Sequence, residues 1–131
     1  MNDVTTVRQY MTTRLVTFTP EMDLHKAIRL LLKHQISGAP VVDARGDLVG
    51  LLSKRDCLRV AFSASYHQEQ AGPVSDYMSR GVETVEADAR LVEVAERFVR
   101  GTFRRFPVVE GGRLVGVISR HDVLRALEEL W

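Results

Sequence analysis

The chain has 131 residues, of which 45% are hydrophobic and 27% are charged, and its formal net charge is +1. A chain of this length buries roughly two-thirds of the surface that its unfolded form exposes, so it can fold without a metal or a disulfide. A charge so close to zero argues against binding to a nucleic-acid duplex. The single cysteine, Cys57, excludes an intramolecular disulfide and a cysteine-based zinc cluster.

Targeting and membrane signals are missing from the sequence. The N-terminus lacks the basic and apolar blocks of a signal peptide. No apolar run approaches the roughly 20 residues that cross a bilayer. The histidines show no metal-ligand spacing. We therefore expect a cytoplasmic protein with no membrane partner and no metal site.

The first half of the chain predicts six elements, which we assign from apolar periodicity and turn residues. The long helix is expected to start behind Asp23 as its N-cap, and its apolar positions follow an i, i+3, i+4, i+7 pattern. In chain order the elements are a lead-in near residues 7–11, a strand over 15–19, a helix from 24, strands over 39–42 and 48–52, and a helix over 54–62.

The second half repeats this order. Tyr10-Met11-Thr12 recurs 67 residues later as Tyr77-Met78-Ser79, and the offset falls to 66 at the turn of the hairpin, where length changes are tolerated. Asp88 is the expected N-cap of the second long helix. The repeated elements are a lead-in near 74–78, a strand over 82–85, a helix from 91, strands over 106–109 and 114–118, and a helix over 120–130.

These repeats predict the domain organisation and the fold class. We place the first repeat at 1–62, a linker at 63–72 and the second repeat at 73–131. Each repeat gives a small sheet with helices on one side, and the other sheet face is left apolar. The expected fold is α/β (α+β), with two β-α-β-β-α repeats packed sheet to sheet about a pseudo-two-fold axis. Neither half should be stable alone.

The best-repeated motif is Gly-x-x-Ser-x-x-Asp, which ends in Ser53 and Asp56 and again in Ser119 and Asp122. One interpretation is structural, because Ser-x-x-Asp at a strand-to-helix corner approximates a capping box. The other is functional, because free amides at a helix start attract phosphate and a carboxylate accepts hydrogen bonds from a ribose diol. The residues alone leave both interpretations open, and capping is the simpler.

The order and recurrence of these motifs resemble the tandem cystathionine β-synthase (CBS) domain pair, or Bateman module, over about residues 7–130. The resemblance implies clefts that bind adenosine-containing ligands such as AMP, ADP, ATP or S-adenosylmethionine as regulators, with no required cofactor. The nucleotide-binding residues that it implies are Thr17, Ser37, Gly38, Ala39, Pro40, Ser53, Asp56, Thr84, Arg104, Arg105, Phe106, Pro107, Ser119, Arg120 and Asp122.

The resemblance also implies roles for these residues. The two aspartates would hold ribose hydroxyls, the two serines would contact ribose or phosphate, and the residues before each proline would line the adenine pocket. Arg104 and Arg105 can supply charge to a phosphate, whereas Ser37 and Gly38 cannot. Phe106 would either stack on a base or block the pocket. The two sites therefore need not be equivalent.

These observations favour a stand-alone regulatory module that binds an adenosine ligand and signals through conformation or association. The resemblance implies a homodimer, and an effector protein is a further expected partner. The alternative is a structural or protein-interaction module without a small-molecule ligand. We expect no catalytic residue, because no nucleophile, base and oxyanion donor come together. Cys57 corresponds to Val123 in the other repeat, which suggests a buried hydrophobic position.

Overall fold

The computed structural model describes residues 4–62 and 71–130. Residues 63–70 of the expected linker lie outside the described part. The chain forms two compact units: unit 1 consists of Met1–Leu15 with Glu83–Trp131, and unit 2 consists of Val16–Val82. The chain therefore passes from one unit to the other at two places, and neither unit is a continuous repeat of the sequence.

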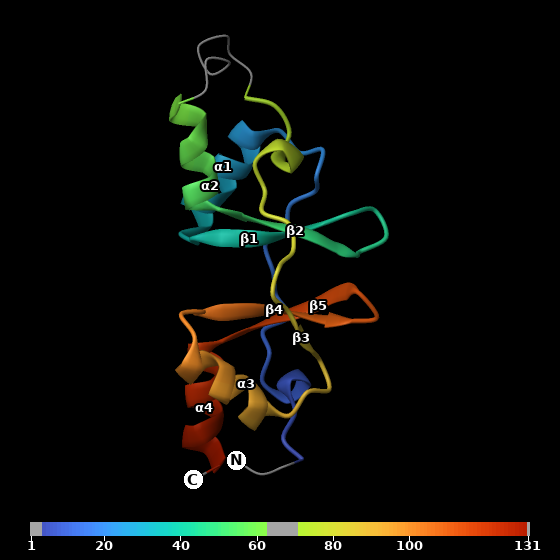
Figure 1. Cartoon of the computed structure of the whole chain (residues 1–131), viewed down its shortest axis with the longest axis vertical. Coiled ribbons are helices and arrows are strands. Elements are labelled where there is room, and N and C mark those ends of the chain that lie inside the picture. Colours follow the sequence, from blue (N-terminus) through green and yellow to red (C-terminus); the bar gives the residue numbers. More distant parts are fainter. Residues whose placement is uncertain (1–3, 63–70, 131) are drawn as a thin grey trace. The chain divides into compact units, whose positions relative to one another are not determined.

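Unit 2 contains a two-stranded antiparallel sheet of β1 (Gly38–Val42) and β2 (Leu48–Ser53) (Figure 1). Phe18 makes a single parallel bridge to Val41, and this bridge is all that forms of the strand expected over 15–19. The helical elements of the unit are α1 (Leu24–His34), α2 (Lys54–Leu58) and the 3-10 turns Arg59–Phe62 and Val74–Asp76.

Unit 1 has the same order, and its third strand forms over the two residues 85–86 in place of the expected 82–85. β3 (Val85–Glu86) pairs in parallel with β4 (Arg105–Glu110), which pairs antiparallel with β5 (Arg113–Ser119). Gly111 and Gly112 form the β4–β5 turn with positive φ angles of 59° and 81°, which glycine adopts without steric cost. The helices are α3 (Leu91–Arg100), α4 (Arg120–Leu130) and the 3-10 turn Val7–Gln9. The mixed fold of two β-α-β-β-α repeats is confirmed.

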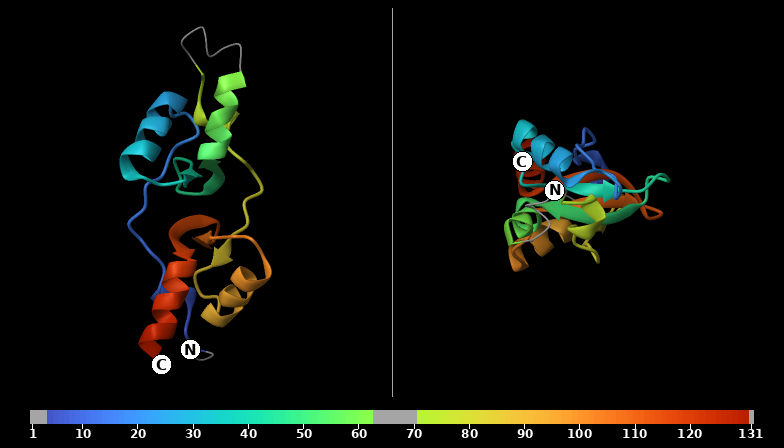
Figure 2. Two further views of the ribbon diagram at one scale, coloured as in Figure 1. Left: turned by 90° about the vertical axis from the view of Figure 1, so that its left-hand side faces the viewer. Right: turned by 90° about the horizontal axis from the view of Figure 1, so that it is seen from above.

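Each unit has its own apolar core between its helices and its sheet. The helices lie as neighbours, α1 beside α2 and α3 beside α4 (Figure 2). The apolar stripe of each long helix is buried as its period predicted. The core of unit 2 is centred on Phe18, Leu24, Leu31, Val41 and Leu52, and that of unit 1 on Leu91, Val94, Phe106, Val108 and Ile118.

The lead-in of each sequence repeat is built into the unit that carries the other repeat's strands and helices. In unit 1, the Leu91 amide donates to the Thr5 carbonyl (2.8 Å) and the Val7 amide to the Ala89 carbonyl (3.0 Å). In unit 2, the Leu24 amide donates to the Gly72 carbonyl (3.0 Å) and the Val74 amide to the Met22 carbonyl (2.8 Å). The two lead-ins are thus exchanged between the repeats.

This exchange explains why the long helices have no side-chain N-cap. Asp23 is the N-cap residue of α1, as expected, but its side chain makes no capping hydrogen bond. The expectation of Asp88 as the second N-cap is wrong, because α3 begins behind Arg90. Asp88 instead accepts a hydrogen bond from Arg8 of the lead-in (3.2 Å). The Gly72 and Thr5 carbonyls, which lie just before the two lead-ins, accept a hydrogen bond from the first amide of α1 and α3, so backbone atoms replace the side-chain cap.

Candidate functional site

The strand-to-helix corner of unit 2 joins the end of β2 to the start of α2. The Ser53 hydroxyl oxygen accepts a hydrogen bond from the Asp56 amide (3.1 Å), and Asp56 Oδ2 accepts one from the Ser53 amide (2.9 Å). This reciprocal pair is the capping box that the Ser-x-x-Asp spacing predicted. One carboxylate oxygen of Asp56 is therefore committed to the helix.

The corner of unit 1 repeats the arrangement at Ser119 and Asp122. Asp122 Oδ2 accepts from the Ser119 amide (2.9 Å) and from the Ser119 hydroxyl (3.0 Å), and the Asp122 amide donates to the Ser119 hydroxyl oxygen (3.2 Å). Asp122 is only 5% exposed, whereas Asp56 is partly exposed. The two corners thus share one hydrogen-bond pattern and differ in access.

The second oxygen of each aspartate faces the exchanged lead-in. Asp56 Oδ1 accepts from the Ser79 hydroxyl (3.3 Å), and Asp122 Oδ1 accepts from the Thr12 hydroxyl at a longer 3.5 Å. Arg125 Nη2 also lies 3.4 Å from Asp122 Oδ1. Each aspartate therefore links three parts of its unit: the strand end, the helix start and the lead-in of the other repeat.

The glycine of each repeated motif provides the space for that lead-in. A Cβ on Gly50 would stand 2.6 Å from the Met78 sulfur, and one on Gly116 would stand 2.7 Å from the Met11 sulfur. Next to these methionines, Ser79 and Leu51 exchange two backbone hydrogen bonds (2.9 and 3.0 Å). Two features of the sequence point to this contact, the repeated Tyr-Met pair and the repeated glycine, but neither indicates that they meet.

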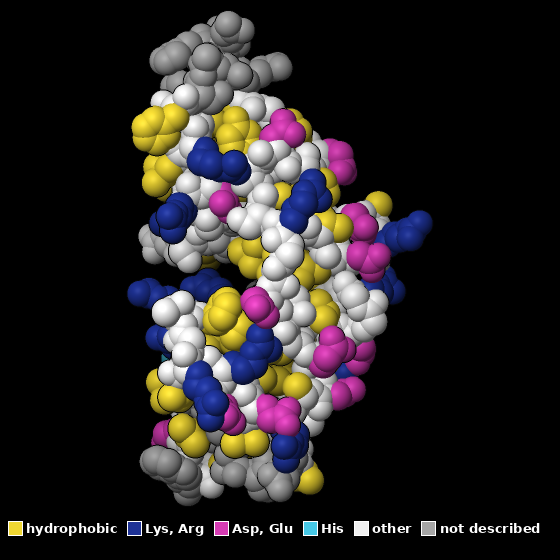
Figure 3. Space-filling view, in the orientation of Figure 1, with side chains coloured by type: hydrophobic (Ala, Val, Ile, Leu, Met, Phe, Trp, Pro, Cys, Tyr) yellow, Lys and Arg dark blue, Asp and Glu magenta, His cyan; other side chains and the backbone are white. Residues whose placement is uncertain are grey.

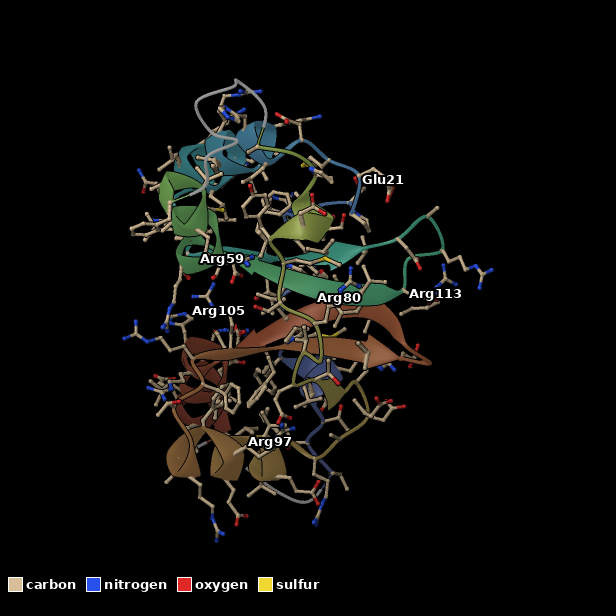
Figure 4. The ribbon with its side chains drawn as sticks, turned by 45° about the horizontal axis from the view of Figure 1, so that its top comes forward. Glu21, Arg59, Arg80, Arg97, Arg105 and Arg113 are labelled. Carbon is tan, nitrogen blue, oxygen red and sulfur yellow. The ribbon has the colours of Figure 1, made fainter. Side chains whose placement is uncertain are left out.

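A repeated arginine clamps each lead-in, and sequence reasoning missed this role. Arg59 donates to the Tyr77 carbonyl and its guanidinium lies 5.3 Å from the centre of the Tyr77 ring (Figure 4). Arg125 donates to the Tyr10 carbonyl (3.0 Å) and lies 5.4 Å from the centre of the Tyr10 ring. Both arginines follow their motif aspartate by three residues, and this shared spacing was the available signal.

In unit 2 the residues expected around the adenine lie next to the Ser53–Asp56 corner. The Ser37 carbonyl accepts from the Lys54 amide (2.8 Å), and Gly38 pairs with Ser53 across β1–β2. Ala39 and Pro40 are buried in the strand, and Thr17 is partly exposed beside the bridging Phe18. The structure therefore brings all seven candidate residues of the first repeat into one unit.

In unit 1 the matching segment lies next to the Ser119–Asp122 corner. The Arg104 carbonyl accepts from the Arg120 amide (3.1 Å), and Arg105 pairs with Ser119 across β4–β5. The Arg120 Nε–H donates to the Phe103 carbonyl (2.8 Å), so this N–H already has a hydrogen-bond partner within the protein. The partly exposed Thr84 precedes β3, and its carbonyl accepts from Arg97 (3.0 Å). The remaining candidate, Pro107, is buried in β4.

The ring of Phe106 belongs to the core of unit 1. It is fully buried, with the Phe98 and Phe103 ring centres 4.9 and 4.8 Å from its own and the Arg97 guanidinium 4.4 Å away. Its faces are therefore occupied by the protein's own side chains. In this conformation the ring is not accessible to a base, and Phe106 can meet a ligand only through its backbone.

The two corners differ in charge. Arg104 and Arg105 are exposed, and neither side chain has an ion-pair partner among the described residues; Arg105 extends away from β4 (Figure 4). The equivalent residues of unit 2, Ser37 and Gly38, are neutral. The Arg104–Arg105 segment therefore adds two positive charges to the corner of unit 1 that the matching segment does not supply in unit 2.

Cys57 follows Asp56 on α2 and is buried, with an exposed fraction of 8%. Burial raises the pKa of its thiol above the usual value of 9.0, and the negative charge of Asp56 raises it further. A thiol held in its protonated form is a poor nucleophile. Within residues 4–62 and 71–130, no group of three or more His, Cys, Asp or Glu side chains is arranged to hold a metal ion.

Comparison with known families explains the duplicated corner. The family model of the CBS domain matches this sequence twice, over residues 7–63 and 74–129. The chain belongs to the CBS domain family. The tandem CBS pair expected from the sequence is thus confirmed.

Relatives of this CBS pair include proteins with bound adenosine compounds. This CBS pair is 34% identical over 125 residues to the uncharacterized protein MJ1225 of Methanocaldococcus jannaschii. The match covers 95% of this chain and 44% of that protein, so the chain spans less than half of the length of this relative. The structure of CBSX2 in complex with AMP matches with a TM-score of 0.83 and 30% identity over 96% of this chain and 98% of that one.

A second solved structure is the CBS domain pair of protein MJ0100 in complex with 5′-methylthioadenosine and S-adenosyl-L-methionine. It matches with a TM-score of 0.74 and 25% identity, covering 98% of this chain and 99% of that one.

In the described part of our chain, the helices are too short or too polar for a membrane span.

Proposed function

We propose that this CBS pair is a regulatory module that binds an adenosine-containing ligand at its Ser–Asp corners. The observation that carries the proposal is the duplicated aspartate: its Oδ2 is fixed by the helix cap, and among the described residues its Oδ1 accepts from side chains. A carboxylate oxygen held in this way is a suitable acceptor for a ribose hydroxyl. The AMP complex of CBSX2 and the MJ0100 complex support the choice of an adenosine compound.

We propose that the signal arises at Oδ1 of each motif aspartate, because the ligand and a lead-in hydroxyl would share this oxygen as hydrogen-bond acceptor. A ribose hydroxyl at Asp56 Oδ1 competes with the Ser79 hydroxyl, and one at Asp122 Oδ1 competes with Thr12. Both hydroxyls belong to exchanged lead-ins. Ligand binding would therefore change how firmly a lead-in is held, and a ligand that favours one arrangement shifts the population toward it. Self-association and an effector protein are the proposed outputs of this change.

The second candidate is a structural or protein-interaction module without a ligand. The capping geometry favours it, because Asp122 is 5% exposed and its carboxylate already has hydrogen-bond partners on both oxygens. On this hypothesis the motif serves only the helix start and the lead-in. The two candidates differ in whether any nucleotide stabilises the protein.

A thermal-shift and calorimetric screen separates them. The wild-type protein is tested with AMP, ADP, ATP, S-adenosylmethionine and, as a control, GTP. A ligand at 100 times its Kd stabilises the folded state by about 2.7 kcal/mol, which gives a clear rise in Tm. Asp56→Asn and Asp122→Asn keep one cap-accepting oxygen and should lose the ligand response. No response to any adenosine compound in the wild type would favour the structural module.

A further inference from the structure

Met11 of the unit 1 lead-in packs against the core of that unit, with its sulfur on Gly116. A Cβ on Gly116 would stand 2.7 Å from this sulfur and 3.0 Å from the Met11 Cγ, so the glycine side of the sulfur has no room for a further atom. The Met11 amide donates to the Val7 carbonyl (2.9 Å), and the next amide, of Thr12, donates to the Val117 carbonyl (2.8 Å). The glycine seat of the sulfur therefore adjoins the backbone bonds that hold the lead-in.

The two methionines that sit on a motif glycine differ in their access to solvent. Met78 of unit 2 is 8% exposed, whereas Met11 is partly exposed. The preceding tyrosines differ in the same way, since Tyr77 is 8% exposed and donates from its hydroxyl to the Ala71 carbonyl (2.8 Å), whereas Tyr10 is partly exposed. Hydrophobic side chains reach the surface of both units (Figure 3), so partial exposure alone does not single out Met11. The combination of partial exposure and the glycine seat does.

The lead-in around Met11 is also joined to the motif aspartate of unit 1. The Thr12 hydroxyl donates to Asp122 Oδ1 at 3.5 Å, and Arg125 donates to the Tyr10 carbonyl (3.0 Å). Hydrogen bonds beside water contribute little each, because water competes for both partners. The apolar contact of Met11 therefore has a large share in holding this segment on the unit.

We propose that Met11 is an oxidation site, and that its conversion to the sulfoxide by hydrogen peroxide releases the lead-in from unit 1. A lone pair of the sulfur attacks one peroxide oxygen, so that an S–O bond forms while the O–O bond breaks. The proton of the transferred oxygen passes to the departing hydroxide, which leaves as water. The sulfur is oxidised by two electrons and the peroxide is reduced, and methionine sulfoxide reductases reverse the change.

The sulfoxide does not fit the place of the thioether. Its oxygen cannot point toward Gly116, where no room is left, and toward the apolar core it would lose its hydration. The Met11 side chain must therefore turn out to water, which weakens the adjoining Thr12–Val117 pair. Because the Thr12 hydroxyl donates to Asp122, the change reaches the Ser–Asp corner. This release needs no bound nucleotide.

Peptide mass spectrometry of the full chain after mild hydrogen peroxide treatment tests the modification. Met11 should be oxidised about tenfold faster than Met78, because the two share one kind of seat and differ in access. In urea the two rates should become equal. Equal rates in the folded protein, or faster oxidation of Met78, would overturn the assignment.

Hydrogen exchange tests the release. In the oxidised protein the amides of Met11 and Thr12 should exchange about tenfold faster or more, while the Ser79 amide of unit 2 keeps its protection. Reduction by methionine sulfoxide reductases should restore the slow exchange. Oxidised Met11 with unchanged exchange at Thr12 would show that the seat tolerates a sulfoxide, and the proposal would fail.

Met11→Leu is the matched control, because it keeps an apolar side chain without sulfur. The same peroxide treatment still oxidises the partly exposed Met22, which packs against the core of unit 2, and exchange at Thr12 should not change. Faster exchange at Thr12 in treated Met11→Leu would assign the effect to another residue and overturn the role of Met11. Both readouts are made without nucleotide, so they are independent of the adenosine screen.

Discussion

The sulfur of Met78 lies 2.6 Å from the place that a Cβ on Gly50 would take, so this methionine of one repeat is seated on the glycine of the other. Met11 and Gly116 repeat the contact at 2.7 Å. The strand that carries Gly50 ends three residues later at Ser53, where the Ser–Asp cap begins. The Gly-x-x-Ser-x-x-Asp motif therefore has two structural roles. The glycine holds the exchanged lead-in, and the aspartate joins that lead-in to the helix.

Gly50→Ala should destabilise the protein by about 1–3 kcal/mol, because the new methyl group meets both the Met78 sulfur and the Ser79 carbonyl. Urea unfolding of wild type and variant measures the difference. In the double variant Gly50→Ala/Met78→Ala the methyl group no longer meets the Met78 side chain and only the Ser79 carbonyl contact remains, so the double variant should cost less than the sum of the two single variants. If the costs of Gly50→Ala and Met78→Ala simply added in the double variant, the contact between Gly50 and Met78 would be contradicted.

Ser79→Ala should strengthen binding of an adenosine ligand in unit 2. The substitution removes the hydroxyl that occupies Asp56 Oδ1 at 3.3 Å and leaves the Ser53 cap intact. A hydrogen bond of this kind is worth about 0.5–1.5 kcal/mol, so a gain of up to roughly tenfold in affinity is expected by calorimetry. Ser75→Ala, in the same lead-in, is the matched control. Weaker binding in Ser79→Ala would mean that the hydroxyl contacts the ligand instead of competing with it.

The repeats, the hairpins and the Ser–Asp caps could be predicted because each depends on residues close together in sequence. The exchange of the lead-ins could not. Tyr10-Met11-Thr12 and Tyr77-Met78-Ser79 are so alike that either fits the seat beside Gly50 or Gly116, and local pattern does not distinguish the two. The misplaced N-cap at Asp88 has the same origin, since a Thr5 carbonyl 86 residues away from Leu91 takes the place of a local cap.

The proximity of the candidate residues could be expected, whereas their geometry could not. The family resemblance implied one site for the Ser37 segment and Ser53, and β1–β2 pairing brings Gly38 opposite Ser53. The sequence did not decide whether Phe106 stacks on a base or blocks the adenine pocket. The alternation of a short strand did not show that Phe98, Phe103 and Arg97 would enclose this ring, because those contacts depend on how α3 packs on β4.

Arg104→Ala/Arg105→Ala should weaken ATP binding more than AMP binding. Both side chains lie beside the Ser119 corner, and each lost phosphate contact removes a charge-assisted hydrogen bond. We expect a loss of about tenfold or more for ATP, less for AMP, and a weaker dependence of ATP affinity on salt. Arg113→Ala is the matched control, since Arg113 pairs with Glu110 at the opposite end of the same two strands. Equal losses for ATP and AMP would argue against a phosphate role.

Cys57 should make stability fall at alkaline pH. Burial, with a smaller part from Asp56, raises the pKa of the folded thiol above its unfolded value of 9.0. The thiol therefore stabilises the fold fully below pH 9.0, and this contribution is lost as pH rises from the unfolded pKa through the folded one. Cys57→Val, which copies Val123 of the other repeat, should flatten this part of the profile.

Urea unfolding of both proteins between neutral and alkaline pH measures that effect, and subtracting the two curves cancels the titration of the lysines and tyrosines that they share. Alkylation by iodoacetamide gives an independent check. The native thiol should react much more slowly than the urea-unfolded one at neutral pH, because it is both buried and protonated. Rapid alkylation of the native protein would show that α2 opens readily and that Cys57 is not held in the core of unit 2.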